Sequence, residues 1–509
     1  MTTPAAPRVF LVGAGPGDPG LLTLRAVECL RLADLVIYDK LVPPRLLDLA
    51  NPGAERRCVA DLPGEHPQRW PIVVRAVIDA ARQGKMVVRL KGGDPLVFGR
   101  GAEEAEELRS AGVPYEIVPG VTAALAAGAS AEIPLTHRSA ASAVAFVTGH
   151  ENPTKPGPGL DWPALARFPG TVVVYMGMAR LELIANMLIE HGKPADTPAA
   201  VVATAGTGDQ RRVTGTLAGL ADAVRAAGLS APAVIVIGPA VGLAPALSWF
   251  EARPLFGKRV LVTRPRQQAG DLVRKLELLG AVPFVLPAVD ILPPADWGEV
   301  DEYLGRIGEY DWLAFTSANG VQMLLGRLRE TGRDLRALAG LKLAAIGPGT
   351  AEALRAFHLN ADLVPAEYRS EGLAAALAEP AAGKRILLAR ADRGRDVLRQ
   401  ELSKVAAVDQ VAVYRQTDAI PTDGPVHDAI RRGEIDFVTL TSANVARAVL
   451  RSLDEIGRAR AHAGDLRLVT ISPVTSAAVT ALGYPVAAEA HEYTTDGLLQ
   501  ALVELAAKS

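Results

Sequence analysis

An internal repeat in the second half of the chain constrains its fold more than any other feature. Three motifs recur 125 positions further on: Thr-Ser-Ala-Asn (316–319 and 441–444), Ile-x-Pro-x-Thr (346–350 and 471–475) and Tyr-x-Ser/Thr-Glu/Asp-Gly-Leu (368–373 and 493–498). A fourth, Val-Leu-Val-Thr-Arg at 260–264, matches Ile-Leu-Leu-Ala-Arg at 386–390 one residue out of step. Such repeats indicate one structural unit used twice. Apolar strand-like runs alternate with helical stretches here, as they do in the first half, so the sequence predicts an α/β fold from end to end.

The composition is that of a multidomain globular protein. With 509 residues, 49% of them hydrophobic, the chain has material for about three or four domains. A helical pattern ends and a new strand begins across 249–257, which places the main domain boundary there. The formal net charge of -2 excludes a global basic field for nucleic acid or an anionic membrane.

Cysteine usage and hydropathy predict the compartment. The two cysteines, Cys29 and Cys58, form neither a disulfide framework nor a metal cluster, and the eight histidines are not spaced as ligands. The sequence shows no export pattern at its start and no apolar run of about 20 residues. We therefore expect a cytoplasmic protein that needs no structural metal.

The first half carries loops suited to ligand binding at the ends of predicted strands. In Lys-Gly-Gly-Asp-Pro at 91–95, Gly92 and Gly93 let the backbone approach a ligand and Pro95 ends the strand. The turn at 13–17 has the wrong glycine spacing for a dinucleotide fingerprint, and Pro16 stiffens it where pyrophosphate should meet a helix N-terminus. Further loops of this kind, at 38–42, 119–123, 134–138, 148–150 and 175–177, indicate one large site.

These motifs, in this order, give residues 8–253 their resemblance to the uroporphyrinogen-III C-methyltransferases of the tetrapyrrole methylase family. The resemblance implies two α/β subdomains, split near 120–140, with S-adenosylmethionine in the cleft between them. It also implies that Asp39 is the candidate proton-handling carboxylate. The residues it assigns to the cofactor are Pro16, Gly92, Gly93, Asp94, Val97, Thr122, Ala123, Met176, Ala205 and Gly206.

The residue types agree with methyl transfer to a pyrrole carbon. Displacement at a sulfonium requires alignment of the reactants and exclusion of water. Because attack makes the macrocycle cationic, the Asp39 carboxylate could stabilise that charge and help remove the proton; alternatively, it caps a local turn. Four cations are candidate partners for substrate carboxylates: Arg89, Lys91, Arg100 and Arg138. The alternative for these cations is solvation, or pairing with Glu103 and Glu104.

This half also departs from the family that it resembles. Members usually carry Val-Gly-Lys-Arg where residues 59–62 read Val-Ala-Asp-Leu, followed by Pro-Gly-Glu-His at 63–66, so Asp61 stands in place of a lysine. The usual Gln and Asn are replaced near Trp70 and Val74, and Ser130 and Glu132 stand where Tyr and Gly are usual. The intact loop at 91–101 still predicts cofactor binding, whereas substrate positioning or rate is expected to differ.

Residues 257–509 resemble uroporphyrinogen-III synthases, on the motifs at 260–265, 315–321, 346–350 and 413–415. The resemblance implies two α/β lobes joined by a pair of strands: lobe one at 257–290 plus 421–509, and lobe two at 291–416. The linear tetrapyrrole hydroxymethylbilane would lie between them and close into a ring, with inversion of the last pyrrole, loss of water and no cofactor. Tyr414 matches a family tyrosine proposed to assist departure of the hydroxyl; a hinge tyrosine is the alternative.

Hydroxyl and amide groups at the strand ends of this half suit substrate carboxylates, although Ser and Asn also cap helices. The candidates are Thr316, Ser317, Asn319, Ser370, Ser442 and Thr475. Charge-assisted bonds would come from Arg264, Arg390, Arg393 and Arg395. Ser472 replaces the glycine expected in the second Gly-Pro-x-Thr motif, which weakens the anion-binding role of that loop.

Together the resemblances predict a bifunctional enzyme. It would convert hydroxymethylbilane to uroporphyrinogen III and then, with two S-adenosylmethionine molecules, to precorrin-2, the branch leading to sirohaem and cobalamin. One alternative is an active synthase joined to an impaired methylase half that binds cofactor or substrate; another is a two-lobed tetrapyrrole sensor without chemistry. The expected partners are tetrapyrroles and, through the methylase half, a second copy of the chain, with no nucleic acid or membrane.

Overall fold

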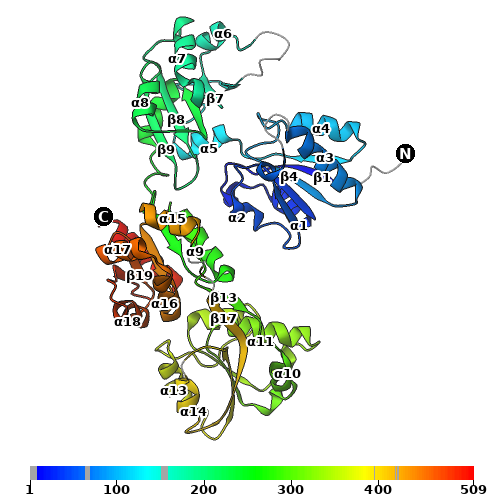
Figure 1. Ribbon diagram of the computed structural model, residues 1–509, viewed down its shortest axis with the longest axis vertical. Helices are drawn as coiled ribbons and strands as arrows, with labels where there is room; N and C mark the ends of the chain where they lie inside the picture. Colours follow the sequence, from blue (N-terminus) through cyan, green and yellow to red (C-terminus); the bar gives the residue numbers. More distant parts are fainter. Residues whose placement is uncertain are drawn as a thin grey trace. The chain divides into compact units, whose positions relative to one another are not determined.

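The computed structural model describes residues 8–63, 69–150, 159–394, 396–418, 420 and 423–508. It divides into two compact units: unit 1 comprises Met1–Gly257 with Leu279–Val282, and unit 2 comprises Lys258–Leu278 with Pro283–Ser509 (Figure 1). The described residues form four five-stranded sheets flanked by helices, which confirms the α/β fold class.

The first sheet of unit 1 is parallel throughout and is buried on both faces. Side chains alternate along a strand, so Phe10 and Val12 pack beneath α1 and α2, whereas Val9 and Leu11 pack beneath α3 and α4. In hydrogen-bonded order its strands are β3 (Glu55–Cys58), β2 (Leu35–Tyr38), β4 (Val87–Lys91), β1 (Val9–Gly13) and β5 (Tyr115–Val118). Its helices are α1 (Leu24–Leu32), α2 (Pro44–Leu47), α3 (Arg69–Arg82) and α4 (Gly101–Ser110).

The second sheet of unit 1 is mixed. Only β6 and β7 run parallel, and the remaining neighbours are antiparallel. One face packs on α6, α7 and α8, and the other on α5 and the 3-10 helix η4 (Pro239–Ala246). In order the strands are β6 (Val144–Thr148), β7 (Thr171–Tyr175), β10 (Ala233–Ile237), β8 (Pro198–Ala203) and β9 (Arg211–Thr216). The helices are α5 (Ala123–Ser130), α6 (Trp162–Arg167), α7 (Leu181–Glu190) and α8 (Leu220–Ala226).

The two sheets of unit 2 define two lobes. Lobe one has the strand order β12 (Val282–Val285), β11 (Arg259–Val262), β18 (Phe437–Leu440), β19 (Arg467–Thr470) and β20 (Ala488–Glu489). Its helices are α9 (Arg266–Leu278), α15 (Pro425–Arg432), α16 (Ala443–Ser452), α17 (Glu455–Ala463), α18 (Pro473–Ala481) and α19 (Thr495–Ala506).

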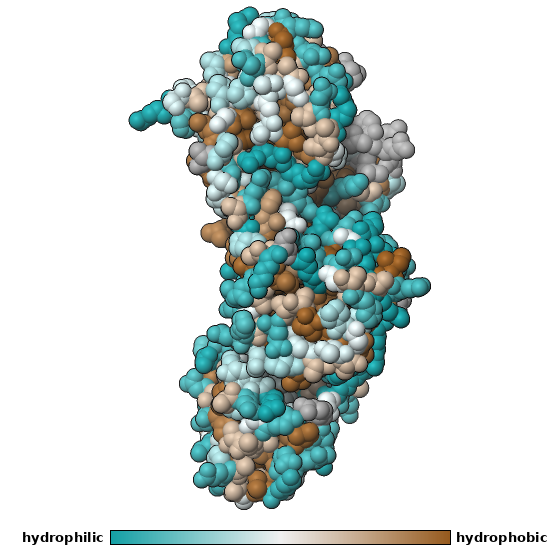
Figure 2. Space-filling model, turned by 90° about the vertical axis from the view of Figure 1, so that its left-hand side faces the viewer, coloured by the Kyte–Doolittle hydropathy of each residue, from teal (hydrophilic) through white to brown (hydrophobic). Residues whose placement is uncertain are grey.

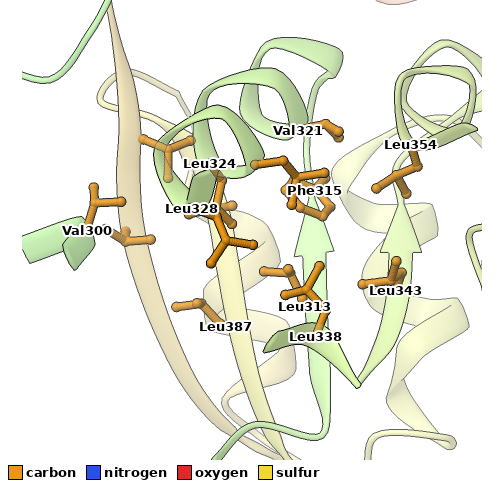
Figure 3. Packing of buried hydrophobic residues seen from close by; sticks show 14 of the residues in the cluster. Val300, Leu313, Phe315, Val321, Leu324, Leu328, Leu338, Leu343, Leu354 and Leu387 are labelled. Carbon is orange, nitrogen blue, oxygen red and sulfur yellow. The ribbon is translucent and has the colours of Figure 1, made fainter. Parts of the chain in front are cut away.

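Lobe two is built around strands β13 (Val289–Leu292), β17 (Ala407–Asp418), β16 (Arg385–Ala391), β14 (Trp312–Phe315) and β15 (Lys342–Ala345), in that order. Its helices are α10 (Gly298–Gly305), α11 (Ala318–Glu330), α12 (Pro348–Arg355), α13 (Ser370–Ala378) and α14 (Val397–Leu402). The core of this lobe places Leu313 and Phe315 of β14 against Leu324 and Leu328 of α11 (Figure 3).

The repeat predicted from the sequence is present in the structure. The strands and helices of lobe two that carry the motifs each have a counterpart in lobe one whose first residue lies 125 positions later. The pairs are β14 and β18, α11 and α16, β15 and β19, α12 and α18, and α13 and α19. The motifs therefore mark equivalent loops in the two lobes.

On the face drawn in Figure 2, hydrophobic residues form small groups among hydrophilic ones. Within the described part of the chain, no helix combines the length and the apolar character that crossing a bilayer requires.

Candidate active sites

Three glycines at strand ends bring the loops of the first sheet into backbone contact. A Cβ on Gly13 would lie 2.6 Å from the Cα of Gly120, and one on Gly120 would lie 2.3 Å from the carbonyl oxygen of Gly93. Gly15 and Gly93 also exchange backbone hydrogen bonds of 3.1 and 2.8 Å. No side chain fits at these contacts, so the glycine spacing of the sequence is explained by packing as well as by ligand approach.

Asp94 holds the same loops together. Its carboxylate accepts hydrogen bonds from the backbone N–H of Leu96 at 2.8 Å and from that of Gly120 at 3.0 Å. The structure therefore gives this proposed cofactor residue an identified role in shaping the loop.

A tyrosine that sequence reasoning did not single out joins the second sheet of unit 1 to the segment that follows β5 of the first sheet. The Tyr175 hydroxyl lies 2.7 Å from Thr122 Oγ1 and accepts the N–H of Ala124 at 3.0 Å, at the start of α5. Tyr175 itself ends β7 in the second sheet. Its position at a strand end, just before Met176 and Gly177, was the available signal.

The residues that the sequence assigned to the cofactor gather around this junction. The Cα of Thr122 and the N of Ala123 lie 3.7 Å from the position of a Cβ on Gly93, and Pro16 lies 3.9 Å from the position of one on Gly206. Val97, Ala123 and Ala205 pack against one apolar cluster. Gly92 donates its N–H to Asp39, and Met176 directly follows Tyr175.

Backbone strain is concentrated in the same region. Phe98, Arg100, Met176 and Thr204 have φ angles between 47° and 59°, in the left-handed region that non-glycine residues rarely adopt. Such conformations persist where the surrounding structure enforces them, and they cluster at functional sites.

A buried group of four charges lies beside the glycine loop. The Glu104 carboxylate accepts from Lys91 Nζ at 2.7 Å and from Arg89 Nε at 3.3 Å, and Arg89 also forms an ion pair with Asp39. Arg89 and Lys91 are only 4% and 2% exposed. Both were predicted to meet substrate carboxylates; in the structure they are enclosed and paired with Glu104 and Asp39, and pairing with Glu104 was the alternative interpretation of the sequence.

These cations control the ionisation of Asp39. Burial by itself raises the pKa of a carboxyl group. The charges of Arg89 and Lys91, with the hydrogen bonds from Arg89 and the Gly92 N–H, outweigh burial and hold the pKa of Asp39 below its ordinary value. Asp39 is therefore a carboxylate at neutral pH, and one-third of its side chain remains exposed.

The other two predicted substrate cations lie at the surface. The Arg100 guanidinium stacks on the ring of Trp70, with 4.6 Å to the centroid, and lies 3.5 Å from Glu103. Arg138 is exposed in the loop after α5. The family departure at Ala60–Leu62 forms a short 3-10 turn, η2 (Val59–Asp61), whereas residues 64–66 lie outside the described residues.

The second candidate site lies at the strand ends of unit 2. Ser317 caps α11 by accepting the N–H of Gly320 at 3.0 Å, and its hydroxyl lies 2.9 Å from that of Tyr414. Ser442 caps α16 through Val445. Both serines thus make the capping contact that was the alternative to carboxylate binding, while Thr316 precedes the first cap.

The Tyr414 side chain is only 3% exposed and belongs to the hydrophobic core of lobe two, while its hydroxyl contacts Ser317. Burial raises its pKa above the ordinary value, against the opposing influence of hydrogen bonds with Ser317 and Asn319. Asn319 also accepts from Gln268 of α9 at 2.6 Å, which joins the two lobes at this point.

The remaining candidates lie near strand ends and helix N-termini of both lobes. Arg264 donates to Thr495 at 3.0 Å, and its pKa is lowered by burial. Arg390 donates to Gln410 at 3.3 Å, and Thr475 lies 3.2 Å from Ser472. Ser370 begins α13, and Arg393 is exposed after β16, whereas Arg395 lies outside the described residues.

Comparison with known proteins assigns each half of the chain. Models of two families match: Tetrapyrrole (Corrin/Porphyrin) Methylases over residues 8–221, and Uroporphyrinogen-III synthase HemD over residues 270–500. Porphyrin biosynthesis protein HemD of Ruminiclostridium josui is 36% identical over 88% of this chain and 89% of its own length. Uroporphyrinogen-III C-methyltransferase of Bacillus subtilis is 39% identical over 66% of this chain and 69% of its own length. The solved structure of uroporphyrin-III C-methyl transferase from Thermus thermophilus complexed with S-adenyl homocysteine is 42% identical in sequence to this chain. The match covers 46% of this chain and 99% of the Thermus chain, with a TM-score of 0.40.

Proposed function

The chain belongs to the tetrapyrrole methylases in its first half and to the HemD uroporphyrinogen-III synthases in its second, and on this premise we propose that it makes uroporphyrinogen III and then methylates it. Unit 2 closes hydroxymethylbilane to uroporphyrinogen III with loss of water. Unit 1 adds two methyl groups from two S-adenosylmethionine molecules and yields precorrin-2. The product of the first reaction is the substrate of the second, which gives a chemical reason for joining the halves.

The proposal for unit 1 rests on one observation. The loops that contain Gly13, Gly93 and Gly120 are in backbone contact, and Thr122, in the last of these loops, is hydrogen-bonded to Tyr175; we call this region the junction. This junction supports a cofactor site formed by Pro16, Gly92, Gly93, Asp94, Val97, Thr122, Ala123, Met176, Ala205 and Gly206. When bound there, S-adenosylmethionine supplies an electrophilic methyl group. The protein orients the acceptor carbon toward that group and keeps water away, and the backbone turns and apolar side chains at the junction suit both tasks.

Asp39 supplies the charge that methyl transfer needs. Attack by a pyrrole carbon leaves the macrocycle with a positive charge until a proton departs. An ionised carboxylate stabilises that charge electrostatically. Because its pKa is lowered, Asp39 is a weak base, so we assign its main role to charge stabilisation and a smaller one to proton removal.

Tyr414 supplies a proton donor in unit 2. Its raised pKa keeps the phenol protonated at neutral pH, and the hydrogen bonds with Ser317 and Asn319 orient it. Hydrogen bonding from the phenol to the departing hydroxyl group of hydroxymethylbilane would assist its loss as water. The carboxylates of that substrate would meet the N-termini of α11 and α16 and the side chains of Arg264 and Arg390.

A second candidate function is favoured by the departure at Asp61. Asp61 occupies a position at which members of the family that this half resembles carry a lysine. It follows β3, which neighbours β2 in the sheet, and β2 ends directly before Asp39. In this alternative unit 2 is an active synthase, whereas unit 1 binds its cofactor without efficient methylation.

One assay separates the two functions. The full chain is incubated anaerobically with hydroxymethylbilane, with and without S-adenosylmethionine, and products are identified by isomer and by the number of added methyl groups. Isomer III with two added methyls supports the proposal, and unmethylated isomer III supports the alternative. Formation of isomer I alone, as in the uncatalysed control, refutes both.

A further inference from the structure

Glu132 is a buried acid in a strained conformation. It follows α5 with a φ angle of 64°, and its side chain is completely buried. Its Oε1 accepts the backbone N–H groups of Trp249 and Phe250, the latter at 2.8 Å. These contacts hold the segment 249–251, which follows η4, against the end of α5.

A cation completes this attachment. Arg212 of β9 lies 3.6 Å from Glu132 Oε2 and 3.2 Å from Glu251 Oε2, and it also donates to the carbonyl of Ala131. Glu132 Oε2 has no hydrogen-bond partner among the described residues, so this ion pair and the two N–H groups on Oε1 together compensate the charge of the carboxylate. Removal of either partner would leave a buried charge poorly compensated.

Gln210 connects this attachment to the proposed cofactor site. Its side chain is buried; Nε2 donates to Ser130 O at 3.0 Å and to Glu251 Oε1 at 3.1 Å, and Oε1 accepts the Gly206 N–H at 3.0 Å. Gly206 belongs to a turn that needs positive φ angles, 47° at Thr204 and 80° at Gly206. One carboxamide therefore ties together that turn, the end of α5 and the segment 249–251.

We propose that the segment 249–251 completes the cofactor site of unit 1. Glu251 fixes the Gln210 carboxamide, and Gln210 fixes the Ala205–Gly206 turn. Both are positioning residues, because they act through the turn and do not contact the cofactor. The inference rests on the proposed function in one respect: Ala205 and Gly206 are taken to face S-adenosylmethionine.

Substitution of Glu251 in the full chain tests this inference. Titration calorimetry measures how tightly each variant binds S-adenosylhomocysteine. Glu251→Ala removes the acceptor of Gln210 and the partner of Arg212, and we expect about tenfold weaker binding, as loss of a buried hydrogen-bonding partner produces. Glu251→Gln keeps an acceptor for Gln210 and should bind within about threefold of the unaltered chain. In turnover, Glu251→Ala should raise the KM for S-adenosylmethionine and leave kcat within about twofold.

Matched controls separate positioning from general damage. Glu190→Ala, at the exposed end of α7, should leave binding unchanged. Hydrogen exchange of the unaltered chain gives a second test that needs no variant: S-adenosylhomocysteine should slow exchange of the Trp249 and Phe250 amides, because coupling between sites is reciprocal.

The outcomes distinguish the inference from its premise. Binding by Glu251→Ala equal to that of the unaltered chain, or exchange at Trp249 and Phe250 that ignores the ligand, would overturn the inference alone. Failure of the unaltered chain to bind S-adenosylhomocysteine would overturn the proposed cofactor and the inference with it.

Discussion

Replacing Glu104 by glutamine tests whether the buried charge group holds unit 1 together. Glu104 is 4% exposed and compensates both Arg89 and Lys91, while Asp39 compensates Arg89 from the other side. The four side chains carry two positive and two negative charges. Glu104→Gln is nearly isosteric but leaves one buried positive charge in excess, so its effect isolates the charge from the packing.

The size of the effect follows from the burial. Removing one partner of a buried ion pair costs about 3–5 kcal/mol. The pKa of Lys91 is already lowered by burial and by the charge of Arg89, so Lys91 can release its proton when Glu104 is lost. This limits the cost to the lower figure, about 3 kcal/mol. Since about 1 kcal/mol shifts the melting temperature of a domain of this size by about 2–4 °C, we expect a decrease of about 6–12 °C.

The two units provide separate readouts for this experiment. Thermal loss of S-adenosylhomocysteine binding reports unit 1, and thermal loss of synthase activity reports unit 2, which should not change. Lys91→Met combined with Glu104→Gln removes one charge of each sign and should recover at least half of the lost stability. Glu103→Gln, an exposed neighbour on α4, is the matched control. A decrease below about 2 °C for Glu104→Gln, or a double variant less stable than the single one, would refute the reasoning.

Three further results are expected. Asp39→Asn should lower the rate of methyl transfer by about 100-fold or more and retain cofactor binding, because it removes the charge and not the cofactor contacts. Asp48→Asn, at an exposed position beside the first sheet, is the control. A single-turnover rate for Asp39→Asn equal to that of the unaltered chain would contradict the assignment. Tyr414→Phe should lower synthase kcat by about 100-fold while methylation of supplied uroporphyrinogen III continues, with Tyr303→Phe on α10 as control; an unchanged kcat would leave Tyr414 a packing residue. His427 is buried with no hydrogen-bond partner for either ring nitrogen among the described residues, and burial together with the charge of Arg431 lowers its pKa. The unfolded chain therefore binds the proton more readily, so the stability contributed by neutral His427 is complete above about pH 6.5 and decreases as the pH falls through the folded-state pKa. Thermal inactivation of the synthase between about pH 5 and 8 measures this, and His427→Phe should flatten the profile.

The order of strands and helices along the chain could largely be predicted from the sequence, because it depends on patterns that recur along the chain. The repeat predicted equivalent helices after the two Thr-Ser motifs, and α11 and α16 both begin at the alanine that follows Ser317 and Ser442. Short apolar runs likewise predicted strands. These features follow from local geometry, so one sequence is sufficient to predict them.

The partners of charged side chains were not readable in the same way. Arg89 and Lys91 alternate with apolar residues in β4, which is compatible with exposure at a site or with burial beside a carboxylate. The decision depends on α4, which covers that face of the sheet and supplies Glu104. Sequence spacing does not reveal which helix covers which face. The network of Glu132, Arg212, Gln210 and Glu251 was not predicted for the same reason, since its members come from three separate segments.

The two proposed catalytic side chains show how environment adapts each group to its reaction. Burial acts on both, and it favours the neutral form of an acid. At Asp39 two neighbouring cations overcome that tendency and keep the carboxyl group ionised, as stabilisation of a cationic macrocycle requires. At Tyr414 the hydrogen-bonding partners are neutral and only partly offset the effect of burial on the pKa. The phenol therefore keeps the proton that loss of a hydroxyl group requires. Opposite shifts thus fit opposite charge demands: unit 1 must meet a developing positive charge, and unit 2 a developing negative one.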